Sequence, residues 1–323
     1  SSSAASDVYK RQIRKIPKLK TISEFKIIEK YLSNIGTSFN KKNKILKGVG
    51  DDAAVISLSN NLIVSTDTSV EGVHFPKGFK PEYAAYRACV IALSDLAAMG
   101  SHPLAFQLSL STKENSPKFF SSFKKGLQDF SNDYKIGLTG GDLVKGQYQI
   151  SVTVFGKQVS KILLRNNSRV GDIVCLSGQL GNGLFGMQNF KKRNRENMIS
   201  SAYLKPKALI DYGKTIAGFA SSAIDISDGF LQDLGHLSKA SNVGFELFSS
   251  SIPYNSNLSL NQCLNCGDDY QLIFTVPKKN IQSLAVKMKK MNFEMYQVGT
   301  SIKTKKIYLD GKIISLNKGY KHF

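Results

Sequence analysis

Nine aspartates are gathered in six short segments, most of which border an apolar run or end in glycine. The segments are GVGDDAA, STDTSVEG, ALSDLAAMG, TGGDLV, DISDG and CGDDYQ, and their acids are Asp51, Asp52, Asp67, Asp95, Asp142, Asp225, Asp228, Asp268 and Asp269. Loops that a rigid scaffold holds carry a disproportionate share of catalytic and binding residues. If these loops meet, so many carboxylates can coexist only around divalent cations.

Asp95 is the acid that is hardest to explain without such a site. A single acid at a strand end is usually a turn residue or a helix cap, and Ser227 or Asp228 could simply cap the helix that follows. Asp95, however, lies inside the apolar stretch EYAAYRACVIALSDLAAM, where an unpaired carboxylate is costly to bury. We therefore expect a cationic group to face it.

Oxygen ligands without a histidine and cysteine set favour Mg²⁺, which carboxylates commonly hold together with substrate phosphates. Calcium is the next option, although the EF-hand spacing is absent. Glycines in GVGDD, LTGGD and SGQLGNGLFG would let backbone N–H groups approach those phosphates. The sequence contains no G-x-x-x-x-G-K-[ST], H-R-D or D-F-G motif, so any nucleotide must bind differently from a P-loop enzyme or a protein kinase.

The acids are expected to be positioned by alternating strands and helices. Apolar periodicity and end signals predict helices over 21–35, 81–99, 117–133, 205–219, 227–242 and 278–291, and strands over 53–58, 61–67, 103–111, 135–141, 148–156, 171–178, 222–227, 243–248 and 270–276, with short strands at the end. The regular βαβ spacing is missing, so we predict an α+β fold in two α/β lobes. We assign 1–20 to a disordered extension, 21–157 to the N-terminal lobe and 158–323 to the C-terminal lobe.

Composition narrows the class of protein. The chain has 323 residues, of which 41% are hydrophobic and 21% charged, as in an ordinary globular protein, and no apolar run is long enough to span a membrane. Four scattered cysteines form no disulfide framework, which indicates a reducing, cytoplasmic compartment. Cys263 and Cys266 form one C-x-x-C without a second pair, so a redox or metal role for them is a minor alternative.

The formal charge of +20 raises nucleic-acid binding as an alternative function. The lysines are dispersed, however, and no zinc-finger or RNP-like pattern accompanies them. We interpret most of them as solvated, with some use in attracting anionic small molecules.

The motifs resemble, in order, those of the thiamine-monophosphate kinase family, within the superfamily that includes aminoimidazole ribonucleotide synthetase. They are GVGDDAAVI, VSTDTSVEGVHF, LSDLAAMGSHP, GGD, ISVTVFG, GDIVCLSG, DISDGFLQDLGHL and GDDYQLIFTV. The resemblance implies transfer of the γ-phosphate of ATP to thiamine phosphate with several Mg²⁺ ions. It also implies an aminoimidazole ribonucleotide synthetase-like fold, in which the N-terminal lobe forms a homodimer and the C-terminal lobe completes the ATP site.

Carried over position by position, the resemblance assigns three groups of residues. The metal-binding positions are Asp52, Ser65, Thr66, Asp67, Asp95, Asp142, Asp225 and Asp228, of which Asp67, Asp142 and Asp228 are the predicted catalytic residues. ATP contacts fall on Gly141, Asp142, Arg165 and Ser227. Thiamine phosphate contacts fall on His74 and Asp268, and Tyr320 is available to stack on the cationic thiazolium.

The chain departs from the family pattern mainly on the substrate side. Ala92 stands where the family usually has Asn, Gln271 replaces Glu, GGDLV replaces GGDTT, and Asn317 replaces a C-terminal tryptophan. A catalytically inactive relative, or a superfamily member with another acceptor, such as selenide or a purine intermediate, therefore remains an alternative. Residues 1–47 lack the cysteine that a selenide user needs, and SDLAAMG with DISDG fits the thiamine branch better than the purine branch.

Overall fold

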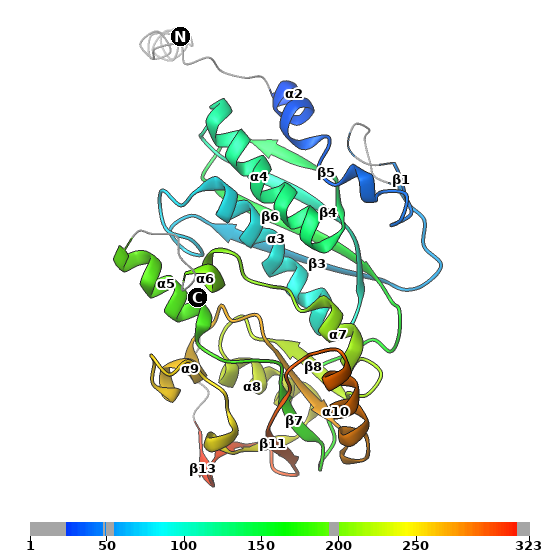
Figure 1. Ribbon diagram of the computed structural model, residues 1–323, viewed down its shortest axis with the longest axis vertical. Helices are drawn as coiled ribbons and strands as arrows, with labels where there is room; N and C mark the ends of the chain where they lie inside the picture. The colour runs from blue at the N-terminus through cyan, green and yellow to red at the C-terminus, as the bar shows by residue number, and fades with distance from the viewer. Residues whose placement is uncertain (1–23, 48, 50–54, 194–199, 315–323) are drawn as a thin grey trace, which may run out of the picture.

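The structure is a computed structural model that describes residues 24–47, 49, 55–193 and 200–314. The described chain forms two lobes with one main sheet each, which lie one above the other in Figure 1. The first lobe contains β1 (Ile45–Lys47), β2 (Val55–Ile56), β3 (Leu62–Val70), α3 (Pro81–Ala98), β4 (His102–Ser111), α4 (Pro117–Tyr134), β5 (Gly137–Val144) and β6 (Gln149–Lys157). A helical turn precedes them in α2 (Glu24–Ile27) and the π-helical Ile28–Leu32.

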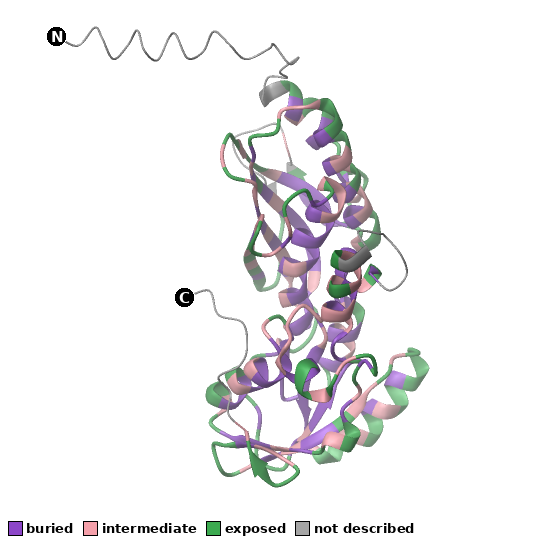
Figure 2. Ribbon diagram, turned by 90° about the vertical axis from the view of Figure 1, so that its left-hand side faces the viewer, coloured by how far each residue is buried: buried purple, intermediate pink, exposed green. Residues whose placement is uncertain are grey.

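The main sheet of the first lobe has the strand order β3-β6-β4-β5, and only β4 and β5 run parallel. Helices α3 and α4 cover one face of it (Figure 1), and Figure 2 shows buried residues concentrated along this contact. Helix α3 begins with Pro81 at its first turn and ends at Met99, after which Gly100 takes a φ of 67°. Such a left-handed glycine is a common helix stop, so the predicted end of this helix is confirmed.

The second lobe begins with β7 (Ile173–Leu176), α5 (Asn182–Arg193), α6 (Ser201–Leu204), α7 (Ile210–Ile216), β8 (Ser222–Asp225) and α8 (Phe230–Ser241). It continues with β9 (Gly244–Leu247), α9 (Leu260–Asn265), β10 (Leu272–Val276), α10 (Ile281–Lys290), β11 (Tyr296–Ile302), β12 (Ile307–Leu309) and β13 (Lys312–Ile313). Its sheet order is β13-β12-β9-β11-β7-β10-β8, and only β12 and β9 are parallel. The fold is therefore α+β with two mixed sheets.

Strand β10 shows how the second sheet is packed on both faces. Leu272 and Phe274 belong to a core shared with α7, α10 and the helices of the first lobe, whereas Ile273 belongs to a second core with α8 and α9. The core of the first lobe thus continues without a break onto one face of the second sheet. A Cβ on Gly213 of α7 would lie 1.9 Å from the carbonyl oxygen of Ala97 in α3, so the close contact between these two helices requires glycine.

Helices of the second lobe differ from the prediction. The predicted helix 205–219 is shorter, because α7 starts only at Ile210 and a separate α6 ends at Leu204. Pro206 explains the break, since proline disfavours helical geometry at the residue before it, and Lys205 indeed has φ −133° and ψ 72°. The segment Asn182–Arg193, for which no helix was predicted, forms α5.

Candidate active site

Three of the predicted acids converge where the two lobes meet. Asp95 in α3 interacts both with Asp67, which lies inside β3, and with Asp225 at the end of β8, and we call these three residues the carboxylate cluster. Asp67 shares a side-chain hydrogen bond with Asp95. Asp95 also accepts a hydrogen bond from the Ser65 hydroxyl. The cluster therefore joins both sheets through α3.

Helix α3 is joined to the second lobe by a buried hydrogen bond. The hydroxyl of Ser94 donates to Oδ2 of Asp225 at 2.7 Å, and both residues are buried. Since Ser94 immediately precedes Asp95, this contact fixes the two acids of opposite lobes beside each other.

Burial and mutual repulsion govern the protonation of the cluster. Burial is the main cause that raises the pKa of Asp67 to about 6, and the charge of Asp95 raises it further. Burial followed by the charge of Asp95 raises the pKa of Asp225 to about 8, against the smaller effects of the Ser94 hydrogen bond and the Arg165 charge. Carboxyl groups that resist ionisation in this way are ready to accept a compensating cation.

A cavity of about 460 Å³ opens beside the cluster. Ser65, Asp95, Arg165, Asn166 and Ala223 are among the residues that line it. Arg165 lies in the connection between the lobes and is exposed. We expected a cationic group to face Asp95, and Arg165 lines the same cavity as Asp95.

The loop after β8 holds a second group of possible ligands. Asp228, Asp233 and His236 offer ligand atoms that all lie within 4.8 Å of one another. Oδ2 of Asp233, however, accepts hydrogen bonds from the backbone N–H groups of Ser227, Asp228 and Gly229, each at 3.1 Å. Asp233 therefore stabilises the loop at the start of α8 through these hydrogen bonds. In this loop Ser227 is exposed and Asp228 is half-buried.

Other predicted metal and ATP positions lie away from the carboxylate cluster. Successive residues of a strand point to opposite faces, and the hydroxyl of Thr66 hydrogen-bonds to that of Thr153 at 2.8 Å on the face away from α3. Any metal contact by Thr66 would have to use its backbone. Gly141 and Asp142 lie on β5, three strands from Asp67 across the sheet, and the exposed Asp142 carboxylate accepts a hydrogen bond from the Leu143 N–H at 2.9 Å.

The substrate positions are placed on two different loops. His74 follows β3, and its Nδ1 accepts a hydrogen bond from the Val70 N–H at 3.0 Å. Asp268 forms an ion pair with Arg87 of α3. Asp52 and Tyr320 lie outside the described residues.

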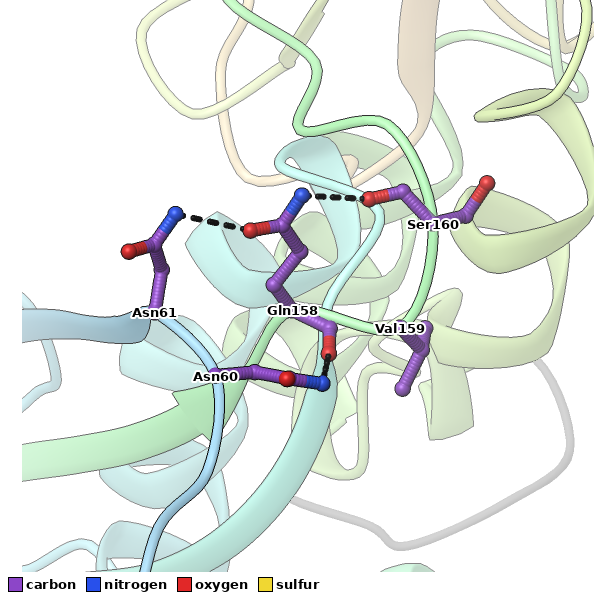
Figure 3. Close-up of a pocket in the computed structure, with 5 residues that line it drawn as sticks. All are labelled: Asn60, Asn61, Gln158, Val159 and Ser160. Carbon is purple, nitrogen blue, oxygen red and sulfur yellow. Dashed lines mark hydrogen bonds between the residues drawn. The ribbon is translucent and has the colours of Figure 1, made fainter.

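A second hollow, of about 360 Å³, lies at the other end of β3. It is lined by Asn60, Asn61, Gln158, Val159 and Ser160, and the amides bond to one another and to backbone carbonyls (Figure 3). All five lining residues are neutral, so this hollow offers neither the charge nor the acid–base chemistry of the cavity at the lobe boundary.

The chemistry of the donors at that boundary fits Mg²⁺. The cluster provides one buried and two half-buried carboxylates with serine hydroxyls beside them, which is a hard oxygen donor set. Burial and the charge of Asp95 both disfavour ionisation of Asp67 and Asp225 and raise their pKa values. A divalent cation would supply a compensating positive charge.

Ser94 and Arg87 are functional candidates that the sequence interpretation did not single out. Both lie in the same apolar helix as Asp95. The cost of burying a charged side chain, which drew attention to Asp95, applies equally to Arg87. That signal could have identified it.

Comparison with protein-family models agrees with this two-lobed architecture and shows to which class of proteins the chain belongs. Residues 50–158 match the family described as AIR synthase related protein, N-terminal domain, and residues 169–312 match AIR synthase related protein, C-terminal domain. Together the two matches cover most of the described chain and make it a two-domain protein of the AIR synthase-related class.

The relatives then specify the branch of this class. A thiamine-monophosphate kinase of Buchnera aphidicola subsp. Schizaphis graminum is 36% identical, over 93% of this chain and 99% of that protein. The crystal structure of thiamine-monophosphate kinase from Stenotrophomonas maltophilia K279a aligns with a TM-score of 0.79 at 27% identity, over 88% of this chain and 98% of that one. AaThiL complexed with AMPPCP and TMP aligns with a TM-score of 0.75 at 29% identity, over 95% and 99%. The chain belongs to the thiamine-monophosphate kinase family, as its motifs predicted.

Proposed function

We propose that this protein transfers the γ-phosphoryl group of ATP to thiamine monophosphate, giving thiamine diphosphate and ADP, by Mg²⁺-assisted in-line transfer. The observation that carries the proposal is the carboxylate cluster of Asp67, Asp95 and Asp225, which both lobes contribute beside a cavity that Arg165 also lines. Relatives along nearly the whole chain are thiamine-monophosphate kinases, and one was solved with AMPPCP and TMP.

The acceptor explains why the site needs no catalytic base. The second pKa of a phosphate monoester is about 6, so its oxygen is already largely ionised at neutral pH. The main barrier is the repulsion between this dianion and the triphosphate, which positioning and charge neutralisation overcome. When bound, Mg²⁺ supplies that neutralising charge.

We propose separate roles in metal and nucleotide binding for the residues of the site. Asp67, Asp95 and Asp225 would hold the metal, with Ser65 and Ser94 orienting the carboxylates. Arg165 would attract the triphosphate into the cavity that it lines. Gly141, Asp142, Ser227 and Asp228 are proposed to contact the nucleotide and its metals from the rims of both lobes. Asp52 is proposed as a further metal ligand.

His74 is proposed to contact thiamine monophosphate from the loop after β3, together with Asp268 and Tyr320. The protonation of His74 matters here, because a neutral Nδ1 that accepts from the Val70 N–H leaves Nε2 as the donor. An Nε2–H group could donate to a phosphate oxygen.

The assembly is proposed to be a homodimer formed through the first lobe. Its sheet has a face opposite α3 and α4 on which Thr66 and Thr68 are exposed, and Leu62 of the same strand is 46% exposed. The cytoplasm is the proposed compartment, since the four cysteines are free. No helix among the described residues has the length and apolar character to cross a membrane.

A coupled ADP-release assay tests the proposed reaction. Thiamine monophosphate, thiamine and no acceptor are compared with MgATP, and each is repeated with EDTA. We expect ADP release only with thiamine monophosphate and Mg²⁺. Equal ADP release in all three reactions would identify an ATPase instead, and no release with thiamine monophosphate would refute the proposal.

A further inference from the structure

Arg87 is a buried arginine that crosses from the first lobe to the second. It lies on α3 with only 3% of its surface exposed. One of its guanidinium nitrogens contacts both carboxylate oxygens of Asp268, and the other donates to the carbonyl of Tyr203 at 2.7 Å. The guanidinium also lies 4.3 Å from the centre of the Tyr203 ring. A single side chain thus binds two separate segments of the second lobe.

The segment that contains Asp268 has an unusual backbone. Asp268 and Tyr270 both have left-handed conformations, with φ of 73° and 50°, which residues other than glycine adopt infrequently. The hydroxyl of Tyr270 donates to Asp268 Oδ1 at 2.6 Å, and Tyr270 is buried. Such conformations persist where surrounding contacts impose them, and the pair formed by Arg87 and Asp268 is the charged contact that does so here.

This segment packs directly against the loop that follows Asp225. The N–H of Asp268 donates to the carbonyl of Ser227 at 3.0 Å, and that of Tyr270 donates to the carbonyl of Ile226 at 2.9 Å. A Cβ on Gly267 would lie 2.1 Å from the Ser227 carbonyl oxygen. The backbone after Asp225 therefore has its position set by residues 267–270.

Two polar side chains on one face of helix α3 bond to the second lobe. Arg87 and Ser94 are seven residues apart, or about two helical turns, and Ser94 donates to Asp225. The ion pair with Asp268 and the hydrogen bond to Asp225 are thus two fixed points between the same helix and neighbouring loops of the second lobe. Asp95 is the residue that follows Ser94.

We infer that Arg87 is a positioning residue, whose ion pair with Asp268 sets the register between the lobes and so holds Asp95 of the first lobe against Asp225 of the second. Asp268 then serves the reaction through this pair as well as through the substrate contact proposed for it above. The inference rests on the proposed function, because the register matters for turnover only if the carboxylate cluster is part of the active site.

The test compares Arg87→Met, Arg87→Lys, Asp268→Asn and the double variant Arg87→Met/Asp268→Asn with wild type. Lys205→Met is the matched control, since Lys205 also links the lobes, through Asp129 of α4 at 2.6 Å, but does not touch residues 267–270. Melting temperature, kcat, the KM for each substrate and the Mg²⁺ concentration for half-maximal turnover are measured.

We expect each single variant at Arg87 or Asp268 to lose at least tenfold in kcat and to need more Mg²⁺. In the two Arg87 variants the KM for thiamine monophosphate should change less than threefold. The double variant should be no slower than the slower single variant, and Lys205→Met should keep its kcat. The melting temperatures should show the same non-additivity. If Arg87→Met does not fold, Arg87→Lys and Asp268→Asn carry the test, because both retain nearly the native volume.

Two results would overturn the inference. One is an unchanged kcat in variants whose melting temperatures fall, which would make the pair merely structural. The other is a rise in the KM for thiamine monophosphate in the Arg87 variants with kcat and the Mg²⁺ requirement unchanged, which would make Arg87 part of substrate binding instead. If the wild type itself lacks turnover that depends on thiamine monophosphate, the proposed function fails instead. In that case the melting temperatures of the wild type, the single variants and the double variant still test the ion pair between Arg87 and Asp268.

Discussion

Asp225 should make the metal-free protein less stable as the pH rises. The carboxyl group is 4% exposed, and its burial, followed by the charge of Asp95, raises its pKa from 3.8 to about 8. The folded state therefore binds this proton more tightly than the unfolded state does. The resulting contribution to the free energy of unfolding declines as the pH rises from about 4 to about 8.

The size of this effect follows from the two pKa values. Between pH 6 and pH 8 the unfolded carboxyl is fully ionised throughout, whereas the folded one goes from protonated to about half ionised. The difference corresponds to about 2 kcal/mol of unfolding free energy, or roughly 3 °C in melting temperature for a protein of this size. Asp67, whose pKa is raised to about 6, contributes in the same direction mainly below pH 6.

Thermal melting of wild type and Asp225→Asn at pH 6 and pH 8 in EDTA measures the effect. Wild type should lose roughly 3 °C more than the variant between the two pH values, and Mg²⁺ should restore wild type at pH 8 but not the variant. His102, whose pKa is lowered by burial, acts in the opposite direction but is present in both proteins. Equal pH slopes, or a variant that is less stable than wild type at pH 8 in EDTA, would refute the reasoning.

Three other outcomes are expected. Asp67→Asn should reduce kcat by roughly 100-fold or more yet raise the melting temperature without Mg²⁺, because it removes a repelling acid; near-normal turnover would contradict the metal role. His74→Ala should weaken thiamine monophosphate binding more than ATP binding in calorimetry, and equal losses would count against substrate contact. Cys266→Ser should keep activity within about twofold in the presence or absence of oxidant, since burial raises the pKa of the Cys266 thiol and makes it unreactive; oxidant-sensitive activity that the variant lacks would restore a redox role.

The sequence was most informative where local chemistry alone decides the structure. Pro81 and Gly100 mark the ends of α3, and Asp95 within this apolar helix indicated a buried charged site. Asp225 was expected near a strand end and ends β8, whereas Asp67, expected at the end of a strand, lies inside the longer β3. These predictions required only the periodicity of each element and the cost of burying charge.

Two features could have been predicted but were not. Strand alternation places the side chain of Thr66 on the face opposite Ser65 and Asp67, and Pro206 marks the break before α7. Each follows from a rule about neighbouring residues. The family resemblance assigned Thr66 by position, without regard to the direction of its side chain.

Long-range contacts lay beyond the reach of the sequence. The distance of Asp142 from Asp67 depends on the strand order β3-β6-β4-β5, which no local pattern specifies. The partnership of Arg87 with Asp268 likewise joins residues 181 positions apart. An arginine in an apolar helix shows that a partner must exist, but not which acid provides it.

The most direct test of the central claim is a crystal structure with Mn²⁺, which replaces Mg²⁺ and can be located by its anomalous scattering, together with a non-hydrolysable ATP analogue. We predict anomalous peaks in direct coordination with carboxylate oxygens of the cluster formed by Asp67, Asp95 and Asp225, with the triphosphate in the adjacent cavity. Mn²⁺ bound only at Asp228 and His236, or nucleotide bound with the cluster free of metal, would contradict the account.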